Sequence, residues 1–200
     1  MTPAPRALAY PVLAAAGLIL AGAMAWSAYS AAADEVAAQL DRAKAELAAG
    51  HAVKAYLSVA NLLADLSART PLFLTAAVFV QGPSRGYGQY DLRPHNVFTR
   101  DEPMLVYLEP SGFDHAKEGE LYRISLACDY AVLDAKGKLL TTDRTLKEID
   151  LVSHQANSEM AIDLRLPYFD LAPGNYVLEL QVRDRLAGDN AKVRLNFRRI

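Results

Sequence analysis

Cysteine is nearly absent from this chain of 200 residues, since Cys128 is its only one. A single cysteine excludes an internal disulfide and a thiolate-rich metal site. An excess of either charge is also missing, because 21 basic and 23 acidic residues give a formal net charge of −2. A nucleic-acid-binding protein is expected to cluster Lys and Arg, so we expect no nucleic acid partner. The 52% of apolar residues still suffice for a packed core.

Short motifs for metal binding and phosphate binding are lacking as well. The chain has four histidines, which are His51, His95, His115 and His154. They form none of the H-x-H, H-x-x-H or H-E-x-x-H spacings that supply zinc ligands, and no G-K-[ST] phosphate loop occurs. A spatial cluster of His95, Asp101 and Glu102 stays open as an alternative. We expect no metal, no cofactor and no enzymatic activity.

Charge is almost missing from residues 1–33, where Arg6 is the only charged residue. An uncharged run rich in Ala and Leu extends from Ala7 to Ala25, and small residues suited to signal cleavage follow at 31–33. This order is typical of a secretory signal peptide, yet the run also approaches the ~20 residues that span a bilayer. A cleaved signal and an uncleaved membrane anchor both remain open. Either one predicts an exported protein of the periplasm or of the extracytoplasmic face of the inner membrane.

Residues 34–70 have the apolar spacing of two short helices. Val36, Leu40, Ala43 and Leu47 share one helical face, and Gly50 interrupts the pattern. A second apolar face follows and ends at Thr70-Pro71; it consists of Val53, Tyr56, Leu57, Ala60, Leu63 and Leu66. The resulting αα-hairpin is similar to one tetratricopeptide-like unit, although a solenoid needs about three. Two interpretations stay open: a packing or spacer hairpin, and a partner-binding surface.

From residue 72 the apolar period changes to two, which is typical of half-buried strands. Strands are expected in seven or eight segments, among them 72–81, 104–108, 121–133, 139–142, 149–151, 160–166, 176–182 and 193–197. One dry face on each strand predicts a mainly β fold over 72–200, with two antiparallel sheets packed as a sandwich. Cys128 falls on the apolar face of its strand and is expected to be a small buried hydrophobe.

The most specific motif is the run L-A-P-G-N-Y at residues 171–176. Leu171, Pro173, Gly174 and Tyr176 resemble the tyrosine corner of immunoglobulin-like and fibronectin-type-III-like sandwiches. The resemblance implies that the Tyr176 hydroxyl bonds back to the upstream backbone. We expect a positive φ at Gly174 in the tight turn. Residues 86–113 are also similar to uncharacterised exported bacterial proteins with a helical hairpin and a C-terminal sandwich, for which no functional residues carry over.

Aromatic residues beside glycines make residues 82–115 the most unusual segment. Tyr87, Tyr90, Arg93 and Phe98 are candidate ligand-binding residues, with the rings stacking on a sugar or peptide and the arginine clamping an anion. The alternative is that these rings fill the core. The crowd of Asp184, Asp189 and Asn190 is expected to form a turn rather than a calcium site.

The expected function is that of an exported, non-catalytic envelope protein. It would act as a protein-interaction or ligand-presenting module whose partner is another envelope protein or an extracytoplasmic ligand. The membrane would be a further partner through the N-terminal segment if that segment is not cleaved. A carbohydrate-binding module and an enzyme with an unrecognised site are the alternatives.

Overall fold

The computed structural model describes residues 33–200, so the proposed signal peptide or anchor lies, but for its last residue, outside the described residues. The chain divides into two compact units between Leu63 and Ala64. Within the described part of the chain, no helix combines the length and the apolarity needed to cross a membrane.

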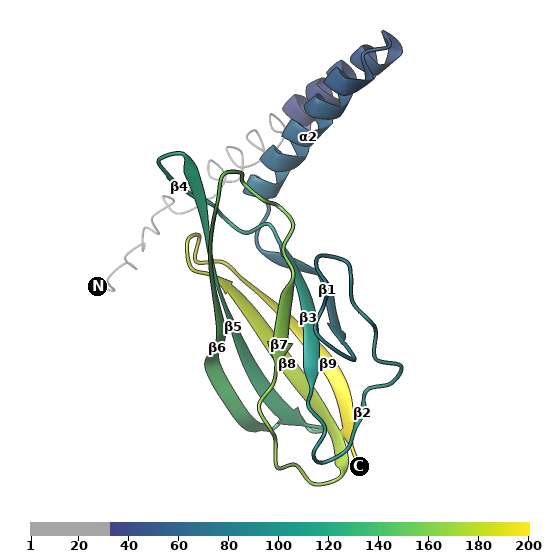
Figure 1. Cartoon of the computed structure of the whole chain (residues 1–200), viewed down its shortest axis with the longest axis vertical. Coiled ribbons are helices and arrows are strands. Elements are labelled where there is room, and N and C mark those ends of the chain that lie inside the picture. Colours follow the sequence, from purple (N-terminus) through teal and green to yellow (C-terminus); the bar gives the residue numbers. More distant parts are fainter. Residues whose placement is uncertain (1–32) are drawn as a thin grey trace, which may run out of the picture. The chain divides into compact units, whose positions relative to one another are not determined.

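The expected helical hairpin lies mainly in the first unit, and the boundary between the units falls within its second helix. Residues 33–48 are helical, and helix α2 spans Ala52–Arg69 (Figure 1). The turn between them is closed by two hydrogen bonds, from the N–H of Gly50 to the carbonyl of Leu47 and from the N–H of His51 to that of Glu46. This is the Schellman pattern, which needs a left-handed residue, and Gly50 has a φ of 81°. The glycine therefore ends the first helix and allows the second to begin.

The second unit is mainly β. Its strands are β1 (Phe73–Phe79), β2 (Val97–Phe98), β3 (Leu105–Ser111), β4 (Ala116–Glu118), β5 (Leu121–Asp134), β6 (Leu139–Ser153), β7 (Ile162–Arg165), β8 (Gly174–Asp184) and β9 (Asn190–Arg199). Strands β1, β3 and β7 form one antiparallel sheet in the order β1-β3-β7. The other strands form a mixed sheet in the order β2-β9-β8-β5-β4, and β6 pairs with β5 (Figure 1). Only the β2–β9 pair in that sheet is parallel.

Side chains from both sheets meet in one hydrophobic core. Alternate residues of β5 contribute Ile124, Leu126, Cys128, Tyr130 and Val132, as the period-two pattern predicts. The opposing sheet contributes residues of β1, β3 and β7 to the same cluster. Cys128 is 1% exposed, which confirms the expected burial, and that burial raises the pKa of its thiol to about 12.

The structure joins two expected strands into one. The segments 139–142 and 149–151 both belong to β6, which pairs with β5 along its length. Between Cys128 and Tyr130 the register shifts, because Cys128 pairs with Lys147 and Tyr130 with Asp143. Two extra residues of β6 therefore form a bulge. The residues between the two expected segments therefore belong to one long strand, with its bulge at 144–146.

Glycine is required where β3 ends. Gly112 has a φ of 74°, and a Cβ atom at this position would lie 2.7 Å from the carbonyl oxygen of Pro71 and 2.8 Å from that of Thr70. Real Cβ atoms do not approach backbone so closely. The chain that leads into β1 can pass the end of β3 only because residue 112 has no side chain.

Candidate interaction surfaces

Large apolar side chains are left exposed on the helical hairpin. Within residues 33–63 the buried apolar residues are Ala43, Ala55 and Leu62. Seven large apolar side chains in the same range are exposed, and they are Leu40, Leu47, Val53, Tyr56, Leu57, Val59 and Leu63. Val53 and Tyr56 are the most exposed, at 74% and 73%. A concentration of exposed large apolar side chains on two helices marks an interaction site more often than a solvated face.

The outer face of the larger sheet is covered by charged side chains instead. Ser125 and Ala127 of β5 point to this face and are nonetheless buried. Long side chains from the neighbouring strands close over the face in cross-strand ion pairs, which are Arg123–Asp150, Arg185–Glu148, Arg183–Asp129 and Arg194–Glu179. The charged side chains of this face are solvated and form ion pairs with one another, so the face offers little apolar surface to a partner.

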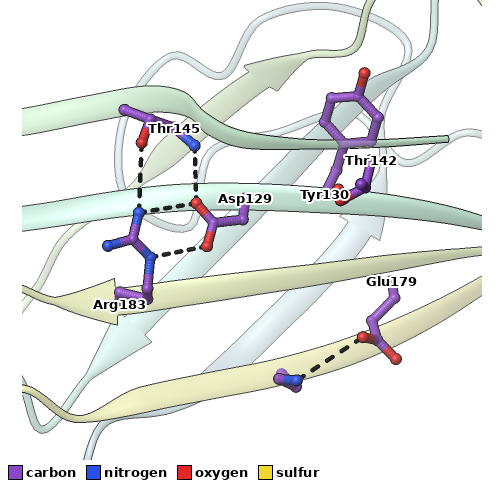
Figure 2. Close-up of polar contacts among 7 residues, drawn as sticks. Asp129, Tyr130, Thr142, Thr145, Glu179 and Arg183 are labelled. Atoms are coloured by element: carbon purple, nitrogen blue, oxygen red, sulfur yellow. Dashed lines mark hydrogen bonds and ion pairs between the residues drawn. The ribbon is translucent and has the colours of Figure 1, made fainter.

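The bulge of β6 is fastened to this face by Asp129. The guanidinium of Arg183 donates from Nε to Oδ2 of Asp129 over 2.8 Å and from Nη2 to Oδ1 over 3.0 Å (Figure 2). The N–H of Thr145 donates to the same Oδ1 over 2.8 Å. Thr145 has a φ of 72°, and no other non-glycine residue of the described chain has a positive φ. The carboxylate therefore holds a strained residue in place.

The chemistry of Asp129 follows from these contacts. Burial opposes ionisation, but the hydrogen bonds from Arg183 and from the N–H of Thr145 outweigh it, so the pKa of Asp129 lies below its ordinary value. A depression of about 230 Å³ beside it is also lined by Thr142, Arg144 and Glu179. Glu179 already accepts a bond from Arg194 at 2.8 Å. Asp129 is thus held as an anion by its partners, which suits a structural role better than proton transfer at neutral pH.

The structure places the four candidate ligand-binding residues of segment 82–115 in different surroundings. Phe98 is 1% exposed and lies in the core, so its ring is covered. The guanidinium carbon of Arg93 lies 4.2 Å from the centre of that ring, and its Nη2 donates to Oε1 of Glu102 over 2.6 Å. Arg93 is thus already stacked and paired, and His95 is linked to it only through a backbone carbonyl.

The two tyrosines of the segment differ from each other. Tyr90 is half-buried, and its ring centre lies 4.2 Å from that of the buried Tyr107. Tyr87 is 39% exposed. The hydroxyl of Tyr107 donates to Glu109 over 2.6 Å and accepts from the N–H of Gly88 over 2.8 Å, which fixes the loop. Of the expected stacking platform, Tyr87 alone presents an exposed ring.

The corner motif has the expected hydrogen bond but not the expected backbone. The hydroxyl of Tyr176 donates to the carbonyl of Ala172 over 2.7 Å, and Leu171 packs partly against the core. The expectation of a positive φ at Gly174 is wrong, because Gly174 begins β8 with ordinary backbone. A Cβ atom there would lie 3.5 Å from the Tyr176 hydroxyl, an ordinary contact. The turn therefore does not need left-handed backbone at this glycine.

A signal in the sequence was missed at residues 82–86, which read G-P-S-R-G and fit the G-x-S-x-G pattern of nucleophile elbows. The elbow requires a strand, a sharp turn and a helix, whereas Ser84 lies in the loop between β1 and β2. Its hydroxyl donates to Oδ2 of Asp163 over 2.8 Å, and its N–H donates to Oδ1 over 3.1 Å. No histidine bonds to Ser84 in the described residues, so it anchors the loop to β7.

The acidic residues near the last hairpin form a turn, as expected. Oδ1 of Asp184 accepts the N–H groups of Leu186 and Ala187, and Oδ2 accepts the N–H of Asp114 over 2.6 Å. Within residues 33–200, no three His, Cys, Asp or Glu side chains converge as a metal site would require. His95, Asp101 and Glu102 are not brought together as such a set.

Comparisons with known proteins assign no family. No protein-family model matches the chain, and no curated protein matches it. Among solved structures, it is similar to the Pseudomonas fluorescens alkylpurine DNA glycosylase AlkC bound to DNA containing an abasic site analog, with 13% identity and a TM-score of 0.37. It is also similar to Bacteroides uniformis beta-glucuronidase, with 15% identity and a TM-score of 0.32. The similarity covers 65% and 63% of this chain but 30% and 12% of those chains.

A calcium binding mutant of Bacteroides uniformis beta-glucuronidase 2 gives 16% identity and a TM-score of 0.32 over 13% of its chain. These neighbours are enzymes, so the expectation that this chain has no enzymatic activity is withdrawn. TM-scores of 0.32 to 0.37 transfer no activity to the chain either.

Proposed function

We propose that the chain is an exported envelope protein that binds another exported protein chain, with a β unit of immunoglobulin-like architecture behind the docking surface. The uncharged run from Ala7 to Ala25 supports export. The strand order supports the architecture, because β1-β3-β7 faces β9-β8-β5-β6 as strands A-B-E face G-F-C-C′ in such domains. The Tyr176–Ala172 hydrogen bond at the start of β8 supports it too, because a tyrosine corner makes a bond of this kind.

The uncovered apolar face of the hairpin carries the proposal. A two-helix unit of a repeat protein cannot bury its apolar face alone and relies on neighbouring units. This hairpin buries Ala43, Ala55 and Leu62 and leaves seven large apolar side chains in solvent. Exposing Val53, Tyr56 and Leu57 is costly at roughly 25 cal/mol per Å² of apolar surface. A partner chain that covers them would recover that free energy.

The charges around the hairpin favour a protein partner over a lipid surface. Residues 33–69 contain four basic and five acidic side chains. Helices that lie on membranes carry an excess of Lys and Arg on their polar face, which anionic lipids attract. A balanced hairpin lacks that attraction, whereas a helix-in-groove or helix-bundle contact with another protein needs no net charge.

Photo-crosslinking in intact cells tests the proposal. Tyr56 is replaced by p-benzoylphenylalanine in the full chain, and the exposed Tyr168 of the β unit serves as the matched control. We expect one discrete protein adduct from position 56 after irradiation and none from position 168. Mass spectrometry of the adduct should identify an exported protein. Equal labelling from both positions, or a cytoplasmic protein in the adduct, would contradict the proposal.

A further inference from the structure

The edge of the larger sheet at β9 presents main-chain groups without partners. Strand β2 lies beside the last residues of β9, where the N–H of Arg198 donates to the carbonyl of Asn96 over 2.9 Å (Figure 1). Because β9 pairs with β8 in unbroken register, the N–H and C=O of alternate residues point to the same side. Lys192 and Arg194 therefore present their N–H and C=O to this edge too. No residue in the described part of the chain bonds to them there.

The core beside this free edge is only partly covered. Phe98 of β2 is 1% exposed and fills the core next to the last residues of β9. Farther along β9, Val193 and Leu195 point to the same core but are only partly buried. A depression of about 410 Å³ lies there, lined by residues 72–77 and by residues 191–193. Strand β1 belongs to the other sheet and does not pair with β9, so among the described strands none fills this place in the larger sheet.

The charges along β9 favour an acidic partner. Lys192, Arg194 and Arg198 share the outer face of the strand. Within residues 33–200, Glu179 is the only carboxylate that forms ion pairs with them, at 2.8 Å from Arg194 and 3.9 Å from Lys192. One carboxylate for three cations leaves an excess of positive charge. A strand added here is therefore stabilised by acidic side chains on its outer face, whereas a second copy of β9 is repelled.

The opposite edge of the same sheet, at β6, is protected against an added strand. Its bulge holds Thr145 in left-handed backbone, which interrupts the edge. The Nζ of Lys147 donates to the carbonyl of Asp163 in β7 over 2.8 Å, so this side chain crosses from one sheet to the other. Bulges and inward-pointing charged side chains are devices that prevent strand addition. Strand β9 has neither, since its register is regular and its basic residues point outward.

We propose that the free edge of β9 binds an extended acidic segment of another protein chain, which adds to the larger sheet in line with β2. The main chain of this segment pairs with the N–H and C=O of Lys192 and Arg194. Its alternate apolar side chains enter the depression beside Val193, and its acidic side chains lie on the outer face beside the cations. This inference goes beyond the proposed function, because it uses the β unit and not the hairpin.

A synthetic peptide tests the strand addition on the full chain. The probe is an acetylated heptapeptide of alternating Glu and Val, and the matched control alternates Lys and Val. At about 1 mM peptide, the glutamate probe should slow amide hydrogen exchange at Lys192 and Arg194, measured by NMR. Exchange at Glu148 and Asp150 should not change, since their amides face the free edge of β6. The lysine control should protect neither edge.

Substitutions at one position separate main-chain pairing from charge. Arg194→Pro removes the outward N–H but keeps the bonds of neighbouring residues to β8, so it should weaken binding of the glutamate probe about tenfold. Arg194→Gln keeps the N–H and should weaken binding about threefold. Val152→Pro, at an outward amide of β6, is the matched control and should leave the affinity unchanged. Circular dichroism confirms that each variant keeps its strands.

Four outcomes overturn the inference: no binding of the glutamate probe at about 1 mM, equal binding of the lysine control, protection at β6 instead of β9, or an unchanged affinity in Arg194→Pro. If Arg194→Pro does not fold, the exchange pattern and the Arg194→Gln affinity decide. Photo-crosslinking from Tyr56 reports on the hairpin alone. The proposed function and this inference can therefore fail separately.

Discussion

The helical hairpin and the β unit solve the problem of apolar surface in opposite ways. The β unit encloses 22 buried residues in one cluster, and ion pairs cover the outer face of its larger sheet. The hairpin, in residues 33–63, buries three apolar side chains and exposes seven. One region covers its apolar side chains by itself, and the other leaves most of its large apolar side chains in solvent. The position of exposed Leu and Tyr therefore says more about function than their number does.

The largest expected change in the free energy of unfolding comes from truncating a core side chain. Truncating an exposed apolar side chain of the hairpin serves as the comparison. Leu126→Ala in β5 should lower the free energy of unfolding of the β unit by about 2–5 kcal/mol, because Leu126 is fully buried. Leu57→Ala in α2 should change it by less than about 0.5 kcal/mol. Urea titration followed by the circular dichroism of the strands measures both. Similar losses in the two variants would contradict the contrast between the buried core of the β unit and the exposed apolar side chains of the hairpin.

The next effect tests whether the charged face is structural. Asp129→Asn removes the anion that faces Arg183 and should cost about 2–3 kcal/mol, because Arg183 is left partly buried without a counter-charge. Glu179→Gln, at the more exposed Arg194 pair, should cost less than about 1 kcal/mol. Thermal unfolding of the two variants against the parent chain measures the difference. Equal costs would mean that burial does not distinguish the two pairs.

The same residue predicts a pH dependence. The folded pKa of Asp129 lies below its unfolded value of about 4, so its contribution is complete above that value. It is lost as pH falls from about 4 through the lower folded pKa. We expect the parent chain to lose stability more steeply than Asp129→Asn below pH ~4. Parallel slopes of unfolding free energy against pH would exclude this linkage.

A smaller loss of stability is expected when the hydrogen bond between Tyr176 and Ala172 is removed. Tyr176→Phe keeps the ring stacked on Phe197 but removes the donor to the carbonyl of Ala172. The expected loss is about 1 kcal/mol of unfolding free energy. Tyr168→Phe, at an exposed hydroxyl that contacts Arg100, should cost less. A larger loss at Tyr168 would show that the corner bond does not stabilise the β unit.

The smallest effect concerns the bulge. Thr145→Gly removes a β-branched side chain from left-handed backbone and keeps the N–H that donates to Asp129. Relief of strain and the greater freedom of glycine when unfolded nearly cancel, so we expect a gain of no more than about 1 kcal/mol. Thr142→Gly, in ordinary strand backbone, should be destabilising by a comparable amount. Chemical denaturation of both variants provides the comparison.

Local periodicity predicted most of the elements, because strands such as β5 and β8 keep one buried face and Gly50 marks the end of the first helix. The same reasoning divided β6 in two, since its polar bulge looks like a loop unless the contact between Thr145 and Asp129 is known. That contact joins residues on two strands, and nothing local reports it. The burial of Phe98 and the engagement of Arg93 likewise depend on packing between distant segments. The G-x-S-x-G pattern at residues 82–86 is the opposite case: the sequence matches a nucleophile elbow, but the strand, sharp turn and helix that an elbow requires are not there.

The turn between β8 and β9 depends on a buried carboxylate that has only backbone partners. Asp184 is 2% exposed, and its two oxygens accept three amide N–H groups, one of them from Asp114 beyond β3. Asparagine would turn an NH₂ toward one of those amides, glutamate would overshoot, and serine offers a single oxygen. If position 184 were randomised and soluble chains were selected, the selected chains should all carry aspartate there.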